Sequence, residues 1–185
     1  TMGLLARALS GSLDDTLAQF RLAFLPLTNP DGNALGNCMT NSLRQNVIFG
    51  FGPAGTGQAA AECEAVWQYV TEARPSFFLE YHSYPHLNRP SFRPYELDRG
   101  LFPDDASRAR GETFFQAVAA VSPNPPVQIQ AGSRMAEQFR PSLISRLVHE
   151  LGIPAPLYKL HNRESVDANL APAHEVLRGV AAAMG

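Results

Sequence analysis

The sequence predicts an α/β fold: a three-layer αβα sandwich in which helices cover both faces of a mixed, largely parallel sheet. Short apolar segments alternate with helical patterns along the chain, as in sheets built from strand–helix units. The segment 76–82 is apolar enough for an interior strand of such a sheet. With 185 residues, 45% of them hydrophobic, the chain can bury one sizeable core. We therefore expect residues 1–185 to form a single domain.

The first half of the chain predicts two helices and a strand ahead of a long loop. Residues 2–10 carry apolar side chains on one side of a helix, and Asp14 suits the start of a second short helix. Residues 21–27 form a short apolar strand that the run Asn-Pro-Asp-Gly at 29–32 stops with a turn. A loop rich in Gly and Asn follows at 33–57, and the clearest helical pattern of the chain occupies 58–74.

The second half continues the alternation. The strand at 76–82 leads into an excursion rich in Pro, Arg and Tyr at 85–103, which we expect to be a loop. Helices are expected at 104–121, 135–151 and 173–183, and a strand at 155–161. Pro141 should kink the middle one of these helices or start its second half, and Gly152 should end it.

Composition and charge exclude several classes of partner. A formal net charge of -2 gives no reason to expect nucleic acid or an anionic membrane surface. No apolar run approaches the roughly 20 residues that span a bilayer, and the first residues lack the basic start of a signal peptide. The location is not determined by the sequence, and a cytoplasmic one is our working expectation. Cys38 and Cys63 could form one bridge, but we favour free thiols.

Two histidines end predicted strands, where open α/β folds place their sites. Because side chains alternate along a strand, Glu80 and His82 should share a face of their strand, and Lys159 and His161 should share a face of theirs. A histidine in this position is either a metal or catalytic residue or a strand cap that bonds locally. The chain contains no HExxH, GxSxG, GxGxxG or Walker motif that would decide between these readings.

The Asn-Pro-Asp-Gly run at 29–32, the Gly- and Asn-rich loop, the helix and the strand that delivers His82-Ser83 follow one another in an order that resembles M14 zinc carboxypeptidases. The resemblance implies a carboxypeptidase-like αβα fold and one zinc ion, with His82 as its third protein ligand. It also implies a substrate with a peptide or small amide bond.

The chain departs from the family pattern at several positions. The family's His-x-x-Glu motif, which supplies the first two zinc ligands, is not found ahead of the Asn-Pro-Asp-Gly run, and its place would be just before Thr1. The N-terminal strands of the family sheet would also precede Thr1, so we expect a companion N-terminal segment or subunit to complete the metal site and to cover an apolar sheet edge.

Other departures concern the substrate and the base. Met39 falls where the family has the arginine that grips the substrate carboxylate, so Arg44 is the remaining candidate in that loop. At the base position the strand carries His161 in place of Glu, with Glu164 three residues later.

Two functions follow from this reading. The first is a zinc-dependent hydrolase of carboxypeptidase type that cleaves a peptide or amide bond, with His82 as metal ligand and His161 or Glu164 as catalytic base. The second is a catalytically inactive binding or assembly protein with the same fold. An N-terminal nucleophile at Thr1 is disfavoured, because the residues that follow it are predicted to be helical.

Overall fold

The computed structural model describes residues 2–9, 11, 20–37, 39–52, 59–84, 92–161 and 164–185. Within this part of the chain, four strands form one mixed sheet in the order β1-β4-β2-β3. Strands β1 and β4 are parallel, as are β2 and β3, whereas β2 runs antiparallel to β4. The strands are β1 (Glu80–Tyr84), β2 (Arg93–Leu97), β3 (Val127–Ile129) and β4 (Leu157–His161).

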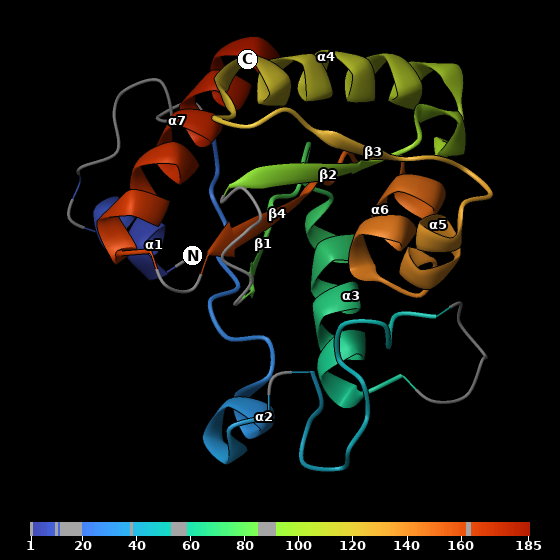
Figure 1. Ribbon diagram of the computed structural model, residues 1–185. Helices are drawn as coiled ribbons and strands as arrows, with labels where there is room; N and C mark the ends of the chain where they lie inside the picture. Colours follow the sequence, from blue (N-terminus) through green and yellow to red (C-terminus); the bar gives the residue numbers. More distant parts are fainter. Residues whose placement is uncertain are drawn as a thin grey trace.

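Helices cover both faces of this sheet (Figure 1). Helices α4 and α7 lie on one face, and α3, α5 and α6 lie on the other, while α2 and the loop after it extend away from the sheet. The three-layer αβα prediction is therefore confirmed. The helices are α1 (Met2–Leu9), α2 (Pro30–Leu35), α3 (Ala61–Ala73), α4 (Asp105–Val121), α5 (Arg134–Phe139), α6 (Leu143–Leu151) and α7 (Val166–Met184), with a 3₁₀ turn, η2 (Arg99–Leu101).

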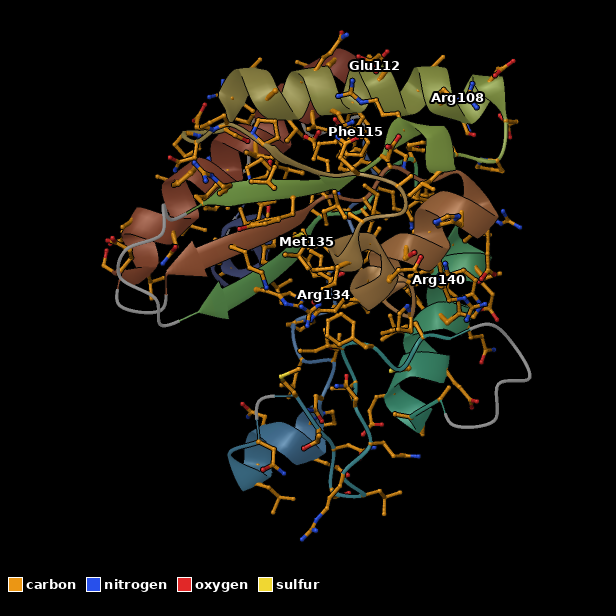
Figure 2. All side chains as sticks on the ribbon, turned by 45° about the vertical axis from the view of Figure 1, so that its right-hand side comes forward. Arg108, Glu112, Phe115, Arg134, Met135 and Arg140 are labelled. Atoms are coloured by element: carbon orange, nitrogen blue, oxygen red, sulfur yellow. The ribbon has the colours of Figure 1, made fainter. Side chains whose placement is uncertain are left out.

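The core between the sheet and α4 is aromatic. The Tyr81 and Tyr158 rings stack with centroids 5.6 Å apart on neighbouring strands. The Ser122 hydroxyl at the end of α4 hydrogen-bonds the buried Tyr158 hydroxyl at 3.1 Å. Phe115 points from α4 toward the sheet and is fully buried (Figure 2). The face of the sheet that carries Tyr81 and Tyr158 therefore packs against α4.

Local sequence signals set most helix ends. The side chains of Asp104 and Ser142 accept hydrogen bonds from backbone N–H groups three residues later, which starts α4 and α6. Gly152 adopts a left-handed φ of 64° and ends α6, as predicted. No helix among the described residues is long and apolar enough to cross a membrane.

Several elements differ from the sequence prediction. Residues 21–27 are extended but form no strand, because no other segment in the described part of the chain hydrogen-bonds to their backbone. The run at 29–32 starts a helix, since the Asn29 side chain caps it and Pro30 fits its first turn. The expected helix at 135–151 is two helices, separated where Ser142 caps the second. Helix α7 begins seven residues early and contains Pro172.

The expected loop at 85–103 is also wrong in part. Its second half contains β2, whose residues alternate toward the core, followed by η2. The expected second helix beginning at Asp14 and the first half of the excursion lie outside the described residues.

Candidate functional site

The carboxyl end of β1 carries a close histidine–carboxylate pair. Glu80 and His82 lie on the same face of the sheet, opposite the face of Tyr81, as strand alternation predicts. His82 Nε2 is 2.5 Å from Glu80 Oε1, and the two side chains are only 19% and 22% exposed. A carboxylate at this distance accepts a hydrogen bond from Nε2–H, which leaves Nδ1 with its lone pair.

Two cationic residues lie on the next two strands of the sheet, β4 and β2. Lys159 of β4 is in register with His82, and Arg93 of β2 is in register with Lys159, so the three residues form a row across one face of the sheet. Within the described part of the chain, two buried atoms here have no hydrogen-bond partner, Glu80 Oε2 and Arg93 Nε. Unpaired buried atoms of this kind cost about 1–3 kcal/mol, so the arrangement favours a further group that would pair with them.

The other residues predicted for the site are less closely grouped. His161 ends β4 with its Cα in register with Tyr84, and its side chain lies outside the described residues. Glu164 is exposed in the connection before α7. Arg44 is exposed in a turn after α2, where it adopts a φ of 61°. Among the described residues no hydrogen bond or ion pair joins Arg44 or Glu164 to His82, so their roles remain predictions.

The turn that carries Arg44 is anchored to α3. The Arg44 backbone N–H donates to the Asn41 carbonyl at 3.0 Å. The Asn41 side chain is buried, accepts from the backbone of Leu43 and Gln45, and donates to Glu62 Oε2 at 3.0 Å. Sequence reasoning did not single out Asn41, although Asn followed by Ser is a common turn former.

The described residues do not by themselves form a zinc site. No group of three or more His, Cys, Asp or Glu side chains in this part of the chain could hold a metal ion. Zinc takes about three protein ligands at a catalytic site. His82, oriented by a carboxylate, fits the role of one ligand, since metal-binding histidines donate their other ring N–H in this way. The donor set is incomplete without ligands from elsewhere.

Two other candidate ligands have structural explanations. Burial lowers the pKa of His149 on α6, with a further contribution from Arg140, so the imidazole is neutral at neutral pH. Cys63 is a buried free thiol, and burial, followed by the nearby Glu62, raises its pKa to about 11. The free-thiol prediction is therefore confirmed for Cys63, while Cys38 lies outside the described residues.

The chain matches no family model, and no curated protein matches its sequence. Its fold, however, is that of solved metallocarboxypeptidases. A metallo-carboxypeptidase from Burkholderia cenocepacia superposes with a TM-score of 0.61 at 16% identity, covering 86% of this chain and 43% of the other. A metallo-carboxypeptidase from Pseudomonas aeruginosa, in complex with (2-guanidinoethylmercapto)succinic acid, gives 0.62 at 15% identity, covering 84% and 44%.

These comparisons establish a divergent M14-like carboxypeptidase fold and confirm the resemblance on which the fold prediction depended. The chain spans less than half the length of each of these two structures.

Proposed function

We propose that this chain is part of a zinc-dependent hydrolase of carboxypeptidase type, in which His82 is a metal ligand. The remaining ligands would come from polypeptide outside residues 1–185. The observation that carries the proposal is the Glu80–His82 pair at the end of β1. The carboxylate holds the imidazole in the tautomer that a metal ligand needs, and the pair lies at the sheet edge where α/β folds place their sites.

The chemistry follows from the residues around this pair. Zinc bound there would act as a Lewis acid on the carbonyl of a peptide or small amide substrate. His161 or Glu164, which end and follow the neighbouring strand, would accept the proton of the attacking water. Arg44, or the Arg93 guanidinium, whose Nε has no hydrogen-bond partner in the described ranges, would pair with a substrate carboxylate.

Elemental analysis of the protein, purified with whatever sequence naturally precedes Thr1, tests the proposal. We expect about one zinc per molecule, lost on substitution His82→Ala. Glu80→Gln should weaken zinc affinity by about 10- to 100-fold, because it removes the carboxylate that orients the ligand. His149→Ala is the matched control, since His149 lies on α6 and not on β1, and this change should leave the zinc content as it is. Wild-type protein that binds no zinc would overturn the proposal.

The alternative is a catalytically inactive binding or assembly protein with the same fold. The row formed by His82, Lys159 and Arg93 favours it, because two neighbouring cations oppose a divalent metal ion. Met39, at the position expected for a substrate-binding arginine, is also unable to form a bidentate contact with a carboxylate. This alternative predicts no zinc and no effect of His82→Ala on the binding of a partner.

A further inference from the structure

Three charged side chains meet where the end of β2 and the turn η2 pack against α4. Glu96 lies near the end of β2 and is buried, Arg99 begins η2, and Glu112 lies on α4 (Figure 2). The Arg99 guanidinium contacts both carboxylates, and its Cζ is 5.7 Å from the centre of the Phe115 ring. Because Glu96 is three residues after Arg93 on one strand, this ionic cluster is on the opposite face of the sheet from the candidate site.

The two carboxylates share the Arg99 guanidinium unequally. Nη1 of Arg99 is 2.9 Å from Oε1 and 2.7 Å from Oε2 of Glu112. Nη2 is 3.8 Å from Oε2 of Glu96, which is too long for a hydrogen bond. The Glu112 side chain is 41% exposed and that of Glu96 only 4%. The guanidinium is therefore held by the more solvated carboxylate, as expected while the buried one is protonated.

Two buried atoms on the facing side chains complement each other. Among the described residues, nothing hydrogen-bonds Arg99 Nε, a donor, or Glu96 Oε1, an acceptor when the carboxyl is ionised. Nε and Nη2 form one edge of the guanidinium, and a carboxylate can accept from both at once. Shortening the Nη2–Oε2 distance from 3.8 Å to about 2.9 Å and bringing Nε to Oε1 would complete such a bidentate pair.

We propose that these residues form a pH-sensitive switch, in which ionised Glu96 draws the Arg99 guanidinium away from Glu112 into a bidentate pair. The exchange is favourable because water and salt weaken a pair with a buried carboxylate less than a pair with an exposed one. Glu112 keeps a partner afterwards, since Gln116 Nε2 donates to its Oε1 at 2.9 Å. The switch lies outside the site of the proposed function and involves no metal ion.

The backbone around Arg99 is anchored, so the exchange needs only the side chain to move. Asp98 Oδ1 accepts from the backbone N–H of Gly100 at 2.8 Å, which caps η2. Asp98 Oδ2 accepts from the backbone N–H of Ala131, just after β3, at 3.1 Å. These bonds fix η2 against the end of β3 while the guanidinium changes partner.

The surroundings of Glu96 set the pH at which the guanidinium moves. In the described part of the chain, the titratable and charged groups that act on or respond to Glu96 are Arg99 of η2, Glu112 of α4 and Tyr158 of β4. Burial raises the pKa of Glu96 to about 7, Arg99 opposes the shift, and Glu112 adds to it. Burial also raises the pKa of Tyr158, which therefore stays protonated throughout. The ion pair between η2 and α4 should thus be present below about pH 7 and lost above it.

Nuclear magnetic resonance on the wild-type protein tests the exchange directly. The Arg99 Nε–H signal and the Glu96 carboxyl carbon are followed between roughly pH 5.5 and 8.5. We expect both signals to change with one midpoint. At the upper pH, Arg99 Nε–H should exchange with water about tenfold more slowly than in Glu96→Gln at the same pH, because an ionised carboxylate then accepts it. An Arg99 signal that stays constant while Glu96 titrates would overturn the proposal.

Substitution at the competing carboxylate gives a second test. Glu112→Gln should leave Glu96 able to titrate but move its midpoint to lower pH, since Arg99 no longer has a charged alternative; an unchanged midpoint would contradict the exchange. A double-mutant cycle between Arg99 and Glu112 should show coupling at roughly pH 5.5 that is lost at roughly pH 8.5. Coupling of equal size at both pH values would show a static ion pair and overturn the proposal. None of these results depends on zinc, so this inference can fail or hold independently of the proposed function.

Discussion

Replacing Glu96 by Gln should remove a large part of the pH dependence of folding stability. Glu96 lies in β2 on the core side and is only 3% exposed. Burial raises the pKa of this carboxyl to about 7, the cation of Arg99 opposes the shift at 3.8 Å, and the charge of Glu112 adds to it. Among the residues that the structure describes, none hydrogen-bonds Glu96 Oε1, so the ionised group is poorly compensated.

The sign and size of this pH dependence follow from the protonation of Glu96 in the folded protein and in the unfolded chain. The folded protein binds this proton more tightly than the unfolded chain, whose glutamate has a pKa of 4.5. The contribution to stability is therefore complete below pH 4.5 and is lost as the pH rises through about 7. The full difference corresponds to about 3 kcal/mol, of which about 2 kcal/mol falls between roughly pH 5.5 and 8.5.

Urea unfolding at these two pH values measures the effect. Glu96→Gln keeps the shape of the side chain and should lose about 2 kcal/mol of pH dependence relative to wild type. Glu112→Gln is the control, because Glu112 pairs with the same Arg99 at 2.7 Å but is 41% exposed. It should retain most of the pH dependence. Any pH dependence of stability that comes from His149 is the same in all three proteins, so it cancels when they are compared. Parallel stability curves for wild type and Glu96→Gln would refute the reasoning.

Two further predictions concern the core. Tyr158→Phe should cost about 1 kcal/mol in urea unfolding, because it removes the hydroxyl that bonds Ser122. Tyr81→Phe should be neutral or stabilising, since the buried Tyr81 hydroxyl has no hydrogen-bond partner among the described residues, and equal losses in both variants would contradict this. Gly111→Ala should destabilise the protein by about 1–3 kcal/mol, because its Cβ would lie 2.5 Å from Phe102 Cζ. A melting temperature at or above that of wild type would contradict the close packing of α4 there.

The parts of the fold that local chemistry decides could be predicted from the sequence. Asp104 and Gly152 mark the start of α4 and the end of α6 through hydrogen bonds and backbone conformations within a few residues of each. The shared face of Glu80 and His82 follows from the alternation of a strand alone. Both predictions needed no knowledge of distant segments.

The parts of the fold that depend on pairing between distant segments could not be predicted from the sequence. Strand β2 was read as loop because Arg93, Pro94 and their neighbours carry no local strand signal, and it exists through its pairing with β3 and β4. Missing β2 also meant missing Arg93 in the row beside His82. Residues 21–27 show the opposite case, since their alternation suits a strand but no described segment pairs with them.

The Glu80–His82 pair on one face of β1 makes elemental analysis decisive between the two candidate functions. If the wild-type protein binds no zinc, the chain has a carboxypeptidase-like fold without that chemistry. If zinc is present, His82→Ala should abolish zinc binding while leaving the melting temperature of the metal-free protein nearly unchanged. Loss of zinc together with a large loss of folding stability would instead indicate that His82 acts through the fold.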